Sequence, residues 1–516
     1  MTSPGAGQPA GSARAGRGVN TPPVQRPLVS PLLRTGSGVD EAARARLVYS
    51  IDGRQLVLVE LKLVAGVSAE DVRAQFRNVF HAAFEHESNP PPDPLPISGH
   101  YMRCLLTQDE ITALADQDTS APPPDRTIFR IWPDYRVRAH IDRSVATIKA
   151  DAATRTYGTS GAGVVWAVID SGIDKDHPHF ACGTVTDPAV ARLHRDFTGL
   201  LTAEGTVTND PASALTDPFG HGTHVAGIIA GAAPKDPGQV LVAQNEPSST
   251  DMPSWVVRTL APGRTLSGMA PQARLVSLKV LNAEGDTVTS VVIAALAQIR
   301  AFNADRGDLL IHGVNLSIGC EWFPDEFAAG QSPLCRELDQ LVATGVVAVV
   351  SAGNSGAGGT ITGGSTDVHG RLSTITDPGN AISAITVGST HRYEPHTYGV
   401  TYTSSKGPTL DGRPKPDLVA PGERITSAAT GALIAGITCL QSDVPGIARY
   451  IEDSGTSMAA PHVSGAIAAF LSVRDEYIGK TDQVKQLVMS NATSLGRHEF
   501  FQGAGLVDLM RVLSSV

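Results

Sequence analysis

The chain has 516 residues, of which 41% are hydrophobic and 18% are charged, and its formal net charge is −10. This length suits two domains and a tail, and the balance of apolar and charged residues is ordinary for a globular protein. Because no basic cluster stands out and no run approaches the roughly 18 apolar residues of a membrane helix, we expect no nucleic-acid partner and no membrane segment.

Residues 1–47 are rich in glycine, proline, alanine and arginine, and they predict a disordered N-terminal tail. The tail lacks the 7–15-residue apolar core of a signal peptide. We therefore expect a cytoplasmic protein. Secretion is the alternative if the start of the chain is assigned wrongly or an upstream part was trimmed.

Residues 48–143 predict a small α+β domain, because segments with strand and helix periodicity alternate along them. Proline interrupts the last strand at Pro133, and a proline-rich loop covers 89–96. The predicted strands are 55–63, 100–106 and 127–138, and the predicted helices are 68–84 and 107–116.

The β-branched run 163–169 predicts a buried parallel strand, and Asp170 follows it directly. A carboxylate at the carboxyl end of such a strand lies where open α/β sheets build their sites. The alternative is that Asp170 only makes a side-chain turn after the strand.

His221 stands between two glycines at the start of a helix of small residues. His224 lies three residues later, so the two rings could share a helix face as metal ligands. The glutamate of a zinc-binding H-E-x-x-H motif is missing, which disfavours zinc. A purely structural histidine is the other alternative. After this helix, residues 232–267 form a polar insertion that we expect on the surface, near the cleft.

The apolar run 346–351 predicts another strand, and Asn354 follows it in a glycine-rich loop. An asparagine amide at this place can donate a hydrogen bond to a developing oxyanion. An ordinary Gly/Asn loop is the alternative.

Ser457 opens an apolar helix within the run 455–462. A serine hydroxyl is a poor nucleophile unless a nearby imidazole accepts its proton. At a helix N-terminus, free backbone N–H groups and the positive end of the dipole would stabilise an oxyanion. The local composition suits a simple helix cap equally well.

The order Asp170, His221, Asn354, Ser457 resembles that of the subtilisin-like serine proteases, the subtilases, and the resemblance extends over about residues 144–516. It implies a doubly wound, mostly parallel sheet with helices on both faces. Further segments match the family pattern: 268–271, 278–281, 315–319, 404–408, 415–422 and 503–506.

The resemblance also implies the roles of individual residues. Asp170, His221 and Ser457 would form the catalytic triad, and Asn354 and the Ser457 backbone N–H would bind the oxyanion. The substrate backbone would pair as an added strand with one segment and face another across the cleft. These segments are Ser317, Ile318 and Gly319 on one side and Gly285, Asp286 and Thr287 on the other.

Asp377 falls near the floor of the family's P1 pocket, which holds the side chain of the residue that contributes the attacked carbonyl. A carboxylate there would favour arginine or lysine at P1. An aspartate before Pro378 is also an ordinary turn residue, and both readings stay open.

The first domain resembles the inhibitor-like propeptide of subtilases in the segments 99–106 and 131–137. The resemblance implies that this domain inhibits the enzyme within the same chain until it is cleaved between Arg138 and Ser144, with Arg143–Ser144 as the first choice. An unrelated partner-binding domain is the alternative.

Two departures concern metals and cysteines. The run 177–179 reads His-Pro-His where many subtilases have His-Pro-Asp, whose aspartate is a calcium ligand, so we doubt the family's main calcium site and leave other calcium open. The chemistry itself requires no cofactor. Five cysteines lack a C-x-x-C pair, and a disulfide between Cys320 and Cys335 stays as open as free thiols. They are Cys104, Cys182, Cys320, Cys335 and Cys439.

Together these features predict a serine endopeptidase that is made as a zymogen and acts on proteins or peptides. One alternative is an intracellular maturation or signalling protease with a single cognate substrate. Another is a catalytically silent binding protein. The sequence does not indicate an oligomeric state.

Overall fold

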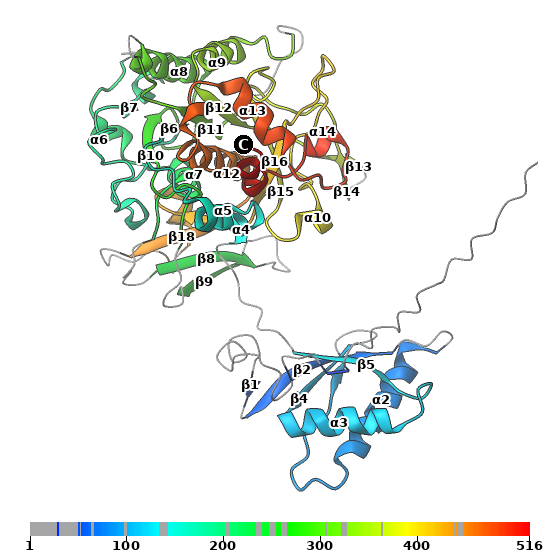
Figure 1. Cartoon of the computed structure of the whole chain (residues 1–516). Coiled ribbons are helices and arrows are strands. Elements are labelled where there is room, and N and C mark those ends of the chain that lie inside the picture. Colours follow the sequence, from blue (N-terminus) through cyan, green and yellow to red (C-terminus); the bar gives the residue numbers. More distant parts are fainter. Residues whose placement is uncertain are drawn as a thin grey trace, which may run out of the picture. The chain divides into compact units, whose positions relative to one another are not determined.

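The computed structural model divides into two compact units, 1–139 and 140–516 (Figure 1). It describes residues 28–29, 33, 50–51, 53–62, 67–96, 101–133, 143–201, 206–233, 240–246, 254–259, 266–304, 307–320, 328–362, 365–437, 440 and 447–516. None of the helices in this described part combines the length and the apolarity that a membrane crossing needs.

The first unit is an antiparallel sheet with two helices, α2 (Ala69–Phe84) and α3 (Gln108–Ser120). In it, β5 pairs with β2, which belongs to the order β1-β2-β4-β3. Both helices begin at a side-chain cap, since Ser68 accepts from Asp71 N and Thr107 forms a capping box with Glu110. The strands are β1 (Ser50–Ile51), β2 (Arg54–Leu61), β3 (Leu95–Pro96), β4 (Tyr101–Leu106) and β5 (Ile128–Pro133).

Alternate residues of these strands face the helices and close a core. Val57 and Val59 from β2 and Met102 from β4 are fully buried there. Leu33 is also fully buried in this core, and Val29 pairs with Ile131. The prediction of a disordered tail over 1–47 is therefore wrong at Leu33, whose apolar side chain joins the core of the first unit. The structure describes only residues 28–29 and 33 of this segment.

The second unit is built on seven parallel strands in the order β16-β15-β12-β11-β6-β10-β7. The chain places β10 on one side of β6 and then crosses to β11 on the other, so the sheet is doubly wound as predicted. The strands are β6 (Val165–Asp170), β7 (Arg195–Asp196), β10 (Arg274–Lys279), β11 (Gly313–Leu316), β12 (Val347–Ser351), β15 (Ile385–His391) and β16 (Leu418–Glu423).

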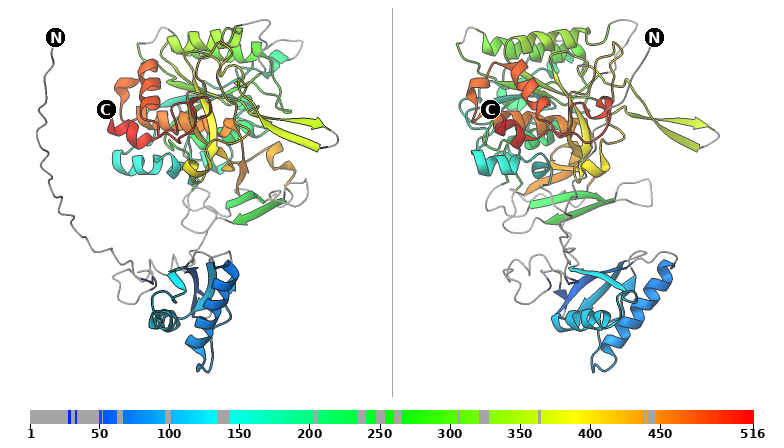
Figure 2. Two further views of the ribbon diagram at one scale, coloured as in Figure 1. Left: turned by 90° about the vertical axis from the view of Figure 1, so that its right-hand side faces the viewer. Right: turned by 45° about the vertical axis from the view of Figure 1, so that its right-hand side comes forward.

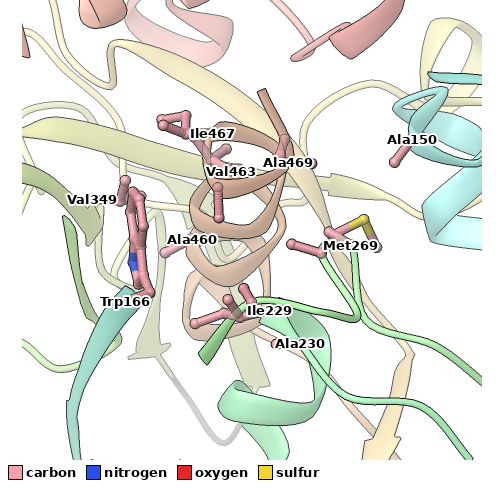
Figure 3. Packing of buried hydrophobic residues seen from close by; sticks show 14 of the residues in the cluster. Ala150, Trp166, Ile229, Ala230, Met269, Val349, Ala460, Val463, Ile467 and Ala469 are labelled. Atoms are coloured by element: carbon pink, nitrogen blue, oxygen red, sulfur yellow. The ribbon is translucent and has the colours of Figure 1, made fainter. Parts of the chain in front are cut away.

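Helices cover both faces of this sheet, which confirms the predicted fold class. On one face lie α7 (His221–Ile229) and α12 (Thr456–Leu471), and on the other lie α8 (Thr289–Asn303) and α9 (Pro333–Ala343). Strand β6 is buried throughout because its side chains alternate between the two cores. Trp166 faces α12 beside Val463 and Ile467, as Figure 3 shows, whereas Ala167 faces α8 and α9.

The insertion 232–267 adds structure that the sequence did not predict. Its described residues form β8 (Val240–Glu246) and β9 (Ser254–Thr259), and Ala232 pairs with Ser267 where the insertion begins and ends. Strand β8 pairs with β18 (Ala448–Asp453), so the insertion extends a four-stranded sheet in the order β17-β18-β8-β9. The inserted segment is thus attached to the strand that leads into α12.

A separate hairpin, β13 (Ala357–Thr362) and β14 (Ser365–Gly370), extends away from the body of the second unit (Figure 2, yellow-green). The remaining helices and strands lie at the periphery. They are α4 (Arg143–Thr147), α5 (Ala150–Tyr157), α6 (Pro211–Ala214), α10 (Pro395–Tyr398), α11 (Ala432–Ala435), α13 (Thr481–Ser490), α14 (Glu499–Gln502), α15 (Leu509–Ser514) and β17 (Ile425–Ala428).

Candidate active site

Asp170 and His221 form a hydrogen-bonded pair at the carboxyl edge of the sheet. Asp170 is the last residue of β6 and is only 1% exposed, and His221 is the first residue of α7. The Nδ1 atom of His221 lies 2.9 Å from Asp170 Oδ1 and 3.0 Å from Asp170 Oδ2. Such a contact fixes the ring so that Nε2, the other nitrogen, can accept a proton.

A close approach of backbone segments makes this pairing geometrically feasible. A side chain at Gly222 would collide with the carbonyl oxygen of Gly172, so glycine is needed where α7 meets the loop after β6. Ser171 joins the two elements, because its Oγ accepts from Gly222 N at 2.8 Å and its N–H donates to Asp170 Oδ1 at 2.8 Å.

Asp217 supports the start of α7, a role that the sequence reasoning missed. This buried carboxylate accepts from Gly220 N at 2.7 Å and from Thr223 N and Oγ1 at 2.8 and 2.6 Å. It satisfies N–H groups that the first turn of a helix leaves open. An aspartate four residues before His221 is the signal that could have identified it.

The electrostatics around His221 favour its protonated form. Burial opposes the charged ring, but the Asp170 carboxylate outweighs this effect, with further help from the charges of Asp453 and Asp217. Together they raise the pKa of His221 to about 9. A neutral ring, which can accept a proton, is therefore favoured by alkaline solution.

Ser457 stands in the first turn of α12, and its hydroxyl is turned toward the segment that directly follows β11. Its Oγ donates to the carbonyl oxygen of Ser317 at 3.0 Å. Within the described residues, no hydrogen bond joins the Ser457 hydroxyl to His221. The Ser457 hydroxyl has to leave the Ser317 carbonyl before its proton can pass to the imidazole.

Pro461 explains a second contact between Ser457 and Ser317. A proline inside a helix cannot donate to the carbonyl four residues earlier, so Pro461 leaves the Ser457 carbonyl without its helical partner. The hydroxyl of Ser317 donates to that oxygen at 2.8 Å. Each of the two serines thus donates its hydroxyl to the backbone of the other.

Asn354 follows β12 and caps α12 from another part of the chain. Its Oδ1 accepts from Thr456 N at 2.9 Å and from Thr456 Oγ1 at 3.1 Å. The residue before the helix, Gly455, has no side chain with which to cap it. With its oxygen held in this way, Asn354 keeps Nδ2 as a donor that has no acceptor among the described residues.

The backbone N–H of Ser457 is equally available. It belongs to the first turn of α12, where N–H groups lack intrahelical acceptors, and the described part of the chain offers it no other partner. Among the described residues, the Ser457 N–H and Asn354 Nδ2 are thus two donors without an acceptor at the start of α12.

A cavity of about 560 Å³ lies beside His221. Its lining combines apolar side chains with polar groups, which suits an extended peptide with apolar side chains. All six residues predicted to bind the substrate backbone line it: Ser317, Ile318, Gly319, Gly285, Asp286 and Thr287. Its apolar lining includes Phe219, Leu281, Val288, Val292 and Leu334.

The Asp377 side chain is closed off from the cleft. Its side chain is 1% exposed and accepts from Asn380 Nδ2 at 2.8 Å. Its backbone pairs with Cys320, so the residue is near the substrate segment while its carboxylate points into protein. The structure therefore gives no support to the predicted preference for arginine or lysine at P1.

At the position of the doubted calcium ligand, His179 is not available to bind a metal ion. His179 is buried, and its two ring nitrogens contact the Tyr450 hydroxyl at 3.0 Å and the Gly227 carbonyl at 3.1 Å. Burial lowers the pKa of His179 to about 3, so the ring is neutral. Across the described residues, no group of three or more histidine, cysteine, aspartate or glutamate side chains could hold a metal ion.

The four described cysteines are free thiols: Cys104, Cys182, Cys320 and Cys335. Cys320 is exposed and lines the 560 Å³ cavity, whereas Cys335 is buried in α9. Cys439 lies outside the described residues. The disulfide between Cys320 and Cys335 that the sequence left open is not formed here.

The predicted cleavage sites fall mostly outside the described residues, which omit 134–142. The first choice, Arg143–Ser144, lies in the first turn of α4, where Ser144 is buried. A protease acts on extended backbone, so α4 would have to unwind before this bond is cut.

Comparison with known proteins places this geometry in context. The model of the subtilase family (Peptidase_S8) matches residues 161–506. The serine protease AprX of Bacillus subtilis is 28% identical over 389 residues, which cover 74% of this chain and 73% of that protein. Subtilisin E of the same species is 28% identical over 369 residues, with 71% and 69% covered.

Two solved structures are also similar to this chain. One is a cold-adapted subtilisin-like serine proteinase, with a TM-score of 0.43, 24% identity and coverage of 68% of this chain and 89% of the other. The second is from proteases of Pseudoalteromonas arctica, with a TM-score of 0.49, 21% identity and coverage of 71% and 94%.

Proposed function

The chain belongs to the subtilase family of serine endopeptidases, and we propose that it cleaves peptide bonds through Ser457, His221 and Asp170. The observation that carries this assignment is the hydrogen-bonded pair of His221 and Asp170, with the Ser457 helix beginning at the same edge of the sheet. Family membership supports the reaction, and the geometry supports the role of each residue.

In the first step the Ser457 oxygen attacks the carbonyl carbon of the scissile bond. The C–O bond forms while the hydroxyl proton passes to Nε2 of His221, which then carries a positive charge. Asp170 stabilises that imidazolium through the contact with Nδ1. Binding of a substrate strand to the Ser317 carbonyl would release the Ser457 hydroxyl from its present acceptor and let it turn to His221.

The negative charge on the former carbonyl oxygen needs donors that are already in position. Asn354 Nδ2 and the Ser457 N–H supply them, supported by the N-terminal end of the α12 dipole. When the tetrahedral intermediate collapses, the C–N bond breaks and the proton on His221 passes to the leaving amine. Ser457 is left acylated.

Water completes the cycle by the reverse sequence. His221 takes a proton from the water as its oxygen attacks the acyl carbon, and Ser457 recovers that proton when the ester C–O bond breaks. The chemistry requires no cofactor.

We further propose that the first unit is an inhibitory propeptide, as its resemblance to such domains implied. The face of its sheet away from α2 and α3 carries Phe129, which is 58% exposed, together with Arg103 and Leu105. An exposed aromatic residue on a sheet face supports docking against another surface. Because Arg143 opens a helix, we favour a cut between Arg138 and Arg143.

A fluorophosphonate probe tests the central assignment. Only a serine that an imidazole activates should react, so the wild-type chain should label, whereas Ser457→Ala and His221→Ala should not. Ser454→Ala is the matched control, because this exposed serine lies three residues from Ser457 and should leave labelling intact. Absence of labelling in the wild-type chain, with or without the first unit, would favour a silent binding protein.

Mass spectrometry of the expressed chain tests the zymogen proposal. The wild-type chain should release its first unit, and Ser457→Ala should stay full length. The same processing in Ser457→Ala would mean that another protease cuts the chain.

A further inference from the structure

The groups that surround the attacked carbonyl determine where the P1 side chain lies. Because these groups are those of the proposed protease mechanism, the inference rests on the proposed function. The carbonyl must lie between the Ser457 hydroxyl and Asn354 Nδ2. Two backbone segments reach this point, 317–319, which contacts Ser457, and 352–354, which ends at Asn354. The P1 side chain has to enter the space between them.

A third segment, 376–377, is hydrogen-bonded to both of these backbone segments, which form the two walls of the space. Thr376 N donates to Ala352 O at 3.2 Å, which links the segment to one wall. Asp377 and Cys320 exchange two backbone hydrogen bonds of 2.8 and 3.1 Å, which link it to the other. Thr376 is therefore fixed at the bottom of the space between the walls, and its side chain is half-buried.

Two glycines show how closely the Thr376 side chain fills that space. A Cβ on Gly353 would lie 2.6 Å from Thr376 Oγ1 and 3.0 Å from its Cγ2. On the opposite wall, a Cβ on Gly319 would lie 2.7 Å from the same Oγ1. Since the same hydroxyl occupies the space that a side chain on either glycine would need, and donates to Ala352 O at 3.5 Å, the threonine side chain lies between the two walls.

We propose that Thr376 closes the bottom of the P1 pocket and restricts the enzyme to small P1 side chains, those of glycine, alanine and serine. Aromatic and long basic side chains would collide with the Thr376 hydroxyl and methyl groups before they could enter. The charge of the P1 side chain should not affect binding through Asp377, because the Asp377 carboxylate is buried against Asn380 on the other side of the backbone.

The 560 Å³ cavity is a different part of the cleft. Thr376 and Gly353 do not line it, whereas Val288, Val292 and Leu334 do. Large apolar side chains of the substrate can therefore be accommodated there, upstream of P1. The protein would accept only small side chains at P1 and larger apolar side chains at substrate positions before P1.

The experiment measures kcat/KM for a series of peptides that differ only at P1, with glycine, alanine, valine, phenylalanine and lysine. For the wild-type enzyme, alanine should exceed phenylalanine and lysine by at least about 10-fold, the discrimination that steric exclusion readily provides. In Thr376→Gly the phenylalanine-to-alanine ratio should rise by at least about 10-fold. Equal rates for alanine, phenylalanine and lysine in the wild-type enzyme would overturn the proposal.

Two conservative variants show whether the volume or the hydroxyl group of Thr376 determines the P1 preference. Thr376→Val keeps the bulk and loses the hydroxyl, so it should keep the preference for alanine. Thr376→Ala removes most of the bulk with less risk to the fold than glycine, and it should relax the preference in the same direction as Thr376→Gly. An unchanged ratio in Thr376→Ala would refute the role of this side chain.

Fluorophosphonate labelling keeps this inference distinct from the proposed function. A chain that labels at Ser457 and cleaves alanine and phenylalanine peptides equally well is a protease without the predicted pocket, so only the inference fails. A mature chain that neither labels nor cleaves any peptide contradicts both.

Discussion

Substitutions of Asn354 should separate two functions of its side chain, the capping of α12 and the donation of a hydrogen bond to the oxyanion. Its oxygen caps α12 through Thr456, and its nitrogen is available to an oxyanion. Asn354→Ala loses both. Removing one oxyanion donor typically lowers kcat by about 10²–10³, or about 2.7–4 kcal/mol of transition-state stabilisation, while losing a helix cap costs about 1 kcal/mol of folding stability.

Asn354→Asp isolates the catalytic part. A carboxylate keeps an oxygen for Thr456 and suits the positive end of the helix, so the free energy of unfolding should stay close to wild type. It cannot donate, and it places a negative charge beside the oxyanion, so kcat should fall at least as far as in Asn354→Ala. Asn491→Ala, at the end of α13 and outside the lining of the cavity beside His221, is the matched control and should leave kcat unchanged.

The assay compares kcat and KM on a fluorogenic peptide with denaturant unfolding of the same preparations. The loss should appear mainly in kcat, because the donor acts on charge that develops only in the transition state. The reasoning is refuted if Asn354→Ala keeps kcat within about threefold of wild type, well short of the loss expected for an oxyanion donor. Equal destabilisation of the alanine and aspartate variants would refute the capping role instead.

The kcat/KM of the wild-type enzyme should rise with pH and level off above about 9, because protonated His221 cannot accept the serine proton; a flat profile in initial-rate measurements would contradict this. Asp170→Asn should move that rise to lower pH, since the charge that raises the pKa of His221 most is then removed while burial still lowers it, and should lower the plateau by on the order of 10⁴. Ser317→Ala should reduce the free energy of unfolding by about 1–2 kcal/mol in denaturant titrations, as the Ser457 carbonyl loses its partner. Trp166→Ala, in the sheet core, should cost about 3–5 kcal/mol in the same titration.

Much of the fold could be predicted because parallel strands buried on both faces are uniformly apolar. The run 163–169 predicted a strand, and β6 occupies Val165–Asp170 with every residue buried. The site side chains were predicted from their place after such strands, for Asp170 and Asn354, or in the first turn of a helix, for His221 and Ser457. The starts of the two helices in the first unit were also predicted to within one residue. The predicted first residues, Ser68 and Thr107, are the N-caps of α2 and α3.

The remaining features depend on contacts between residues far apart in sequence. Local pattern could not reveal that the Ser457 hydroxyl would point to Ser317, 140 residues away, or that β8 would pair with β18. The P1 pocket shows the limit most clearly. Asp377 and Thr376 are neighbours, and only the direction of each side chain reveals that the threonine faces the walls of the pocket while the carboxylate is buried behind it.

The cap that Asn354 provides for α12 has a consequence for how the molecule acquires its activity. About a hundred residues separate Asn354 from Thr456, so the hydrogen bonds between them exist only once the late part of the chain has joined the sheet. A nascent or partly unfolded polypeptide would lack this junction and therefore could not yet hydrolyse its neighbours. Activity of the proposed site would thus begin only after residues from both ends of this long interval have joined the same sheet.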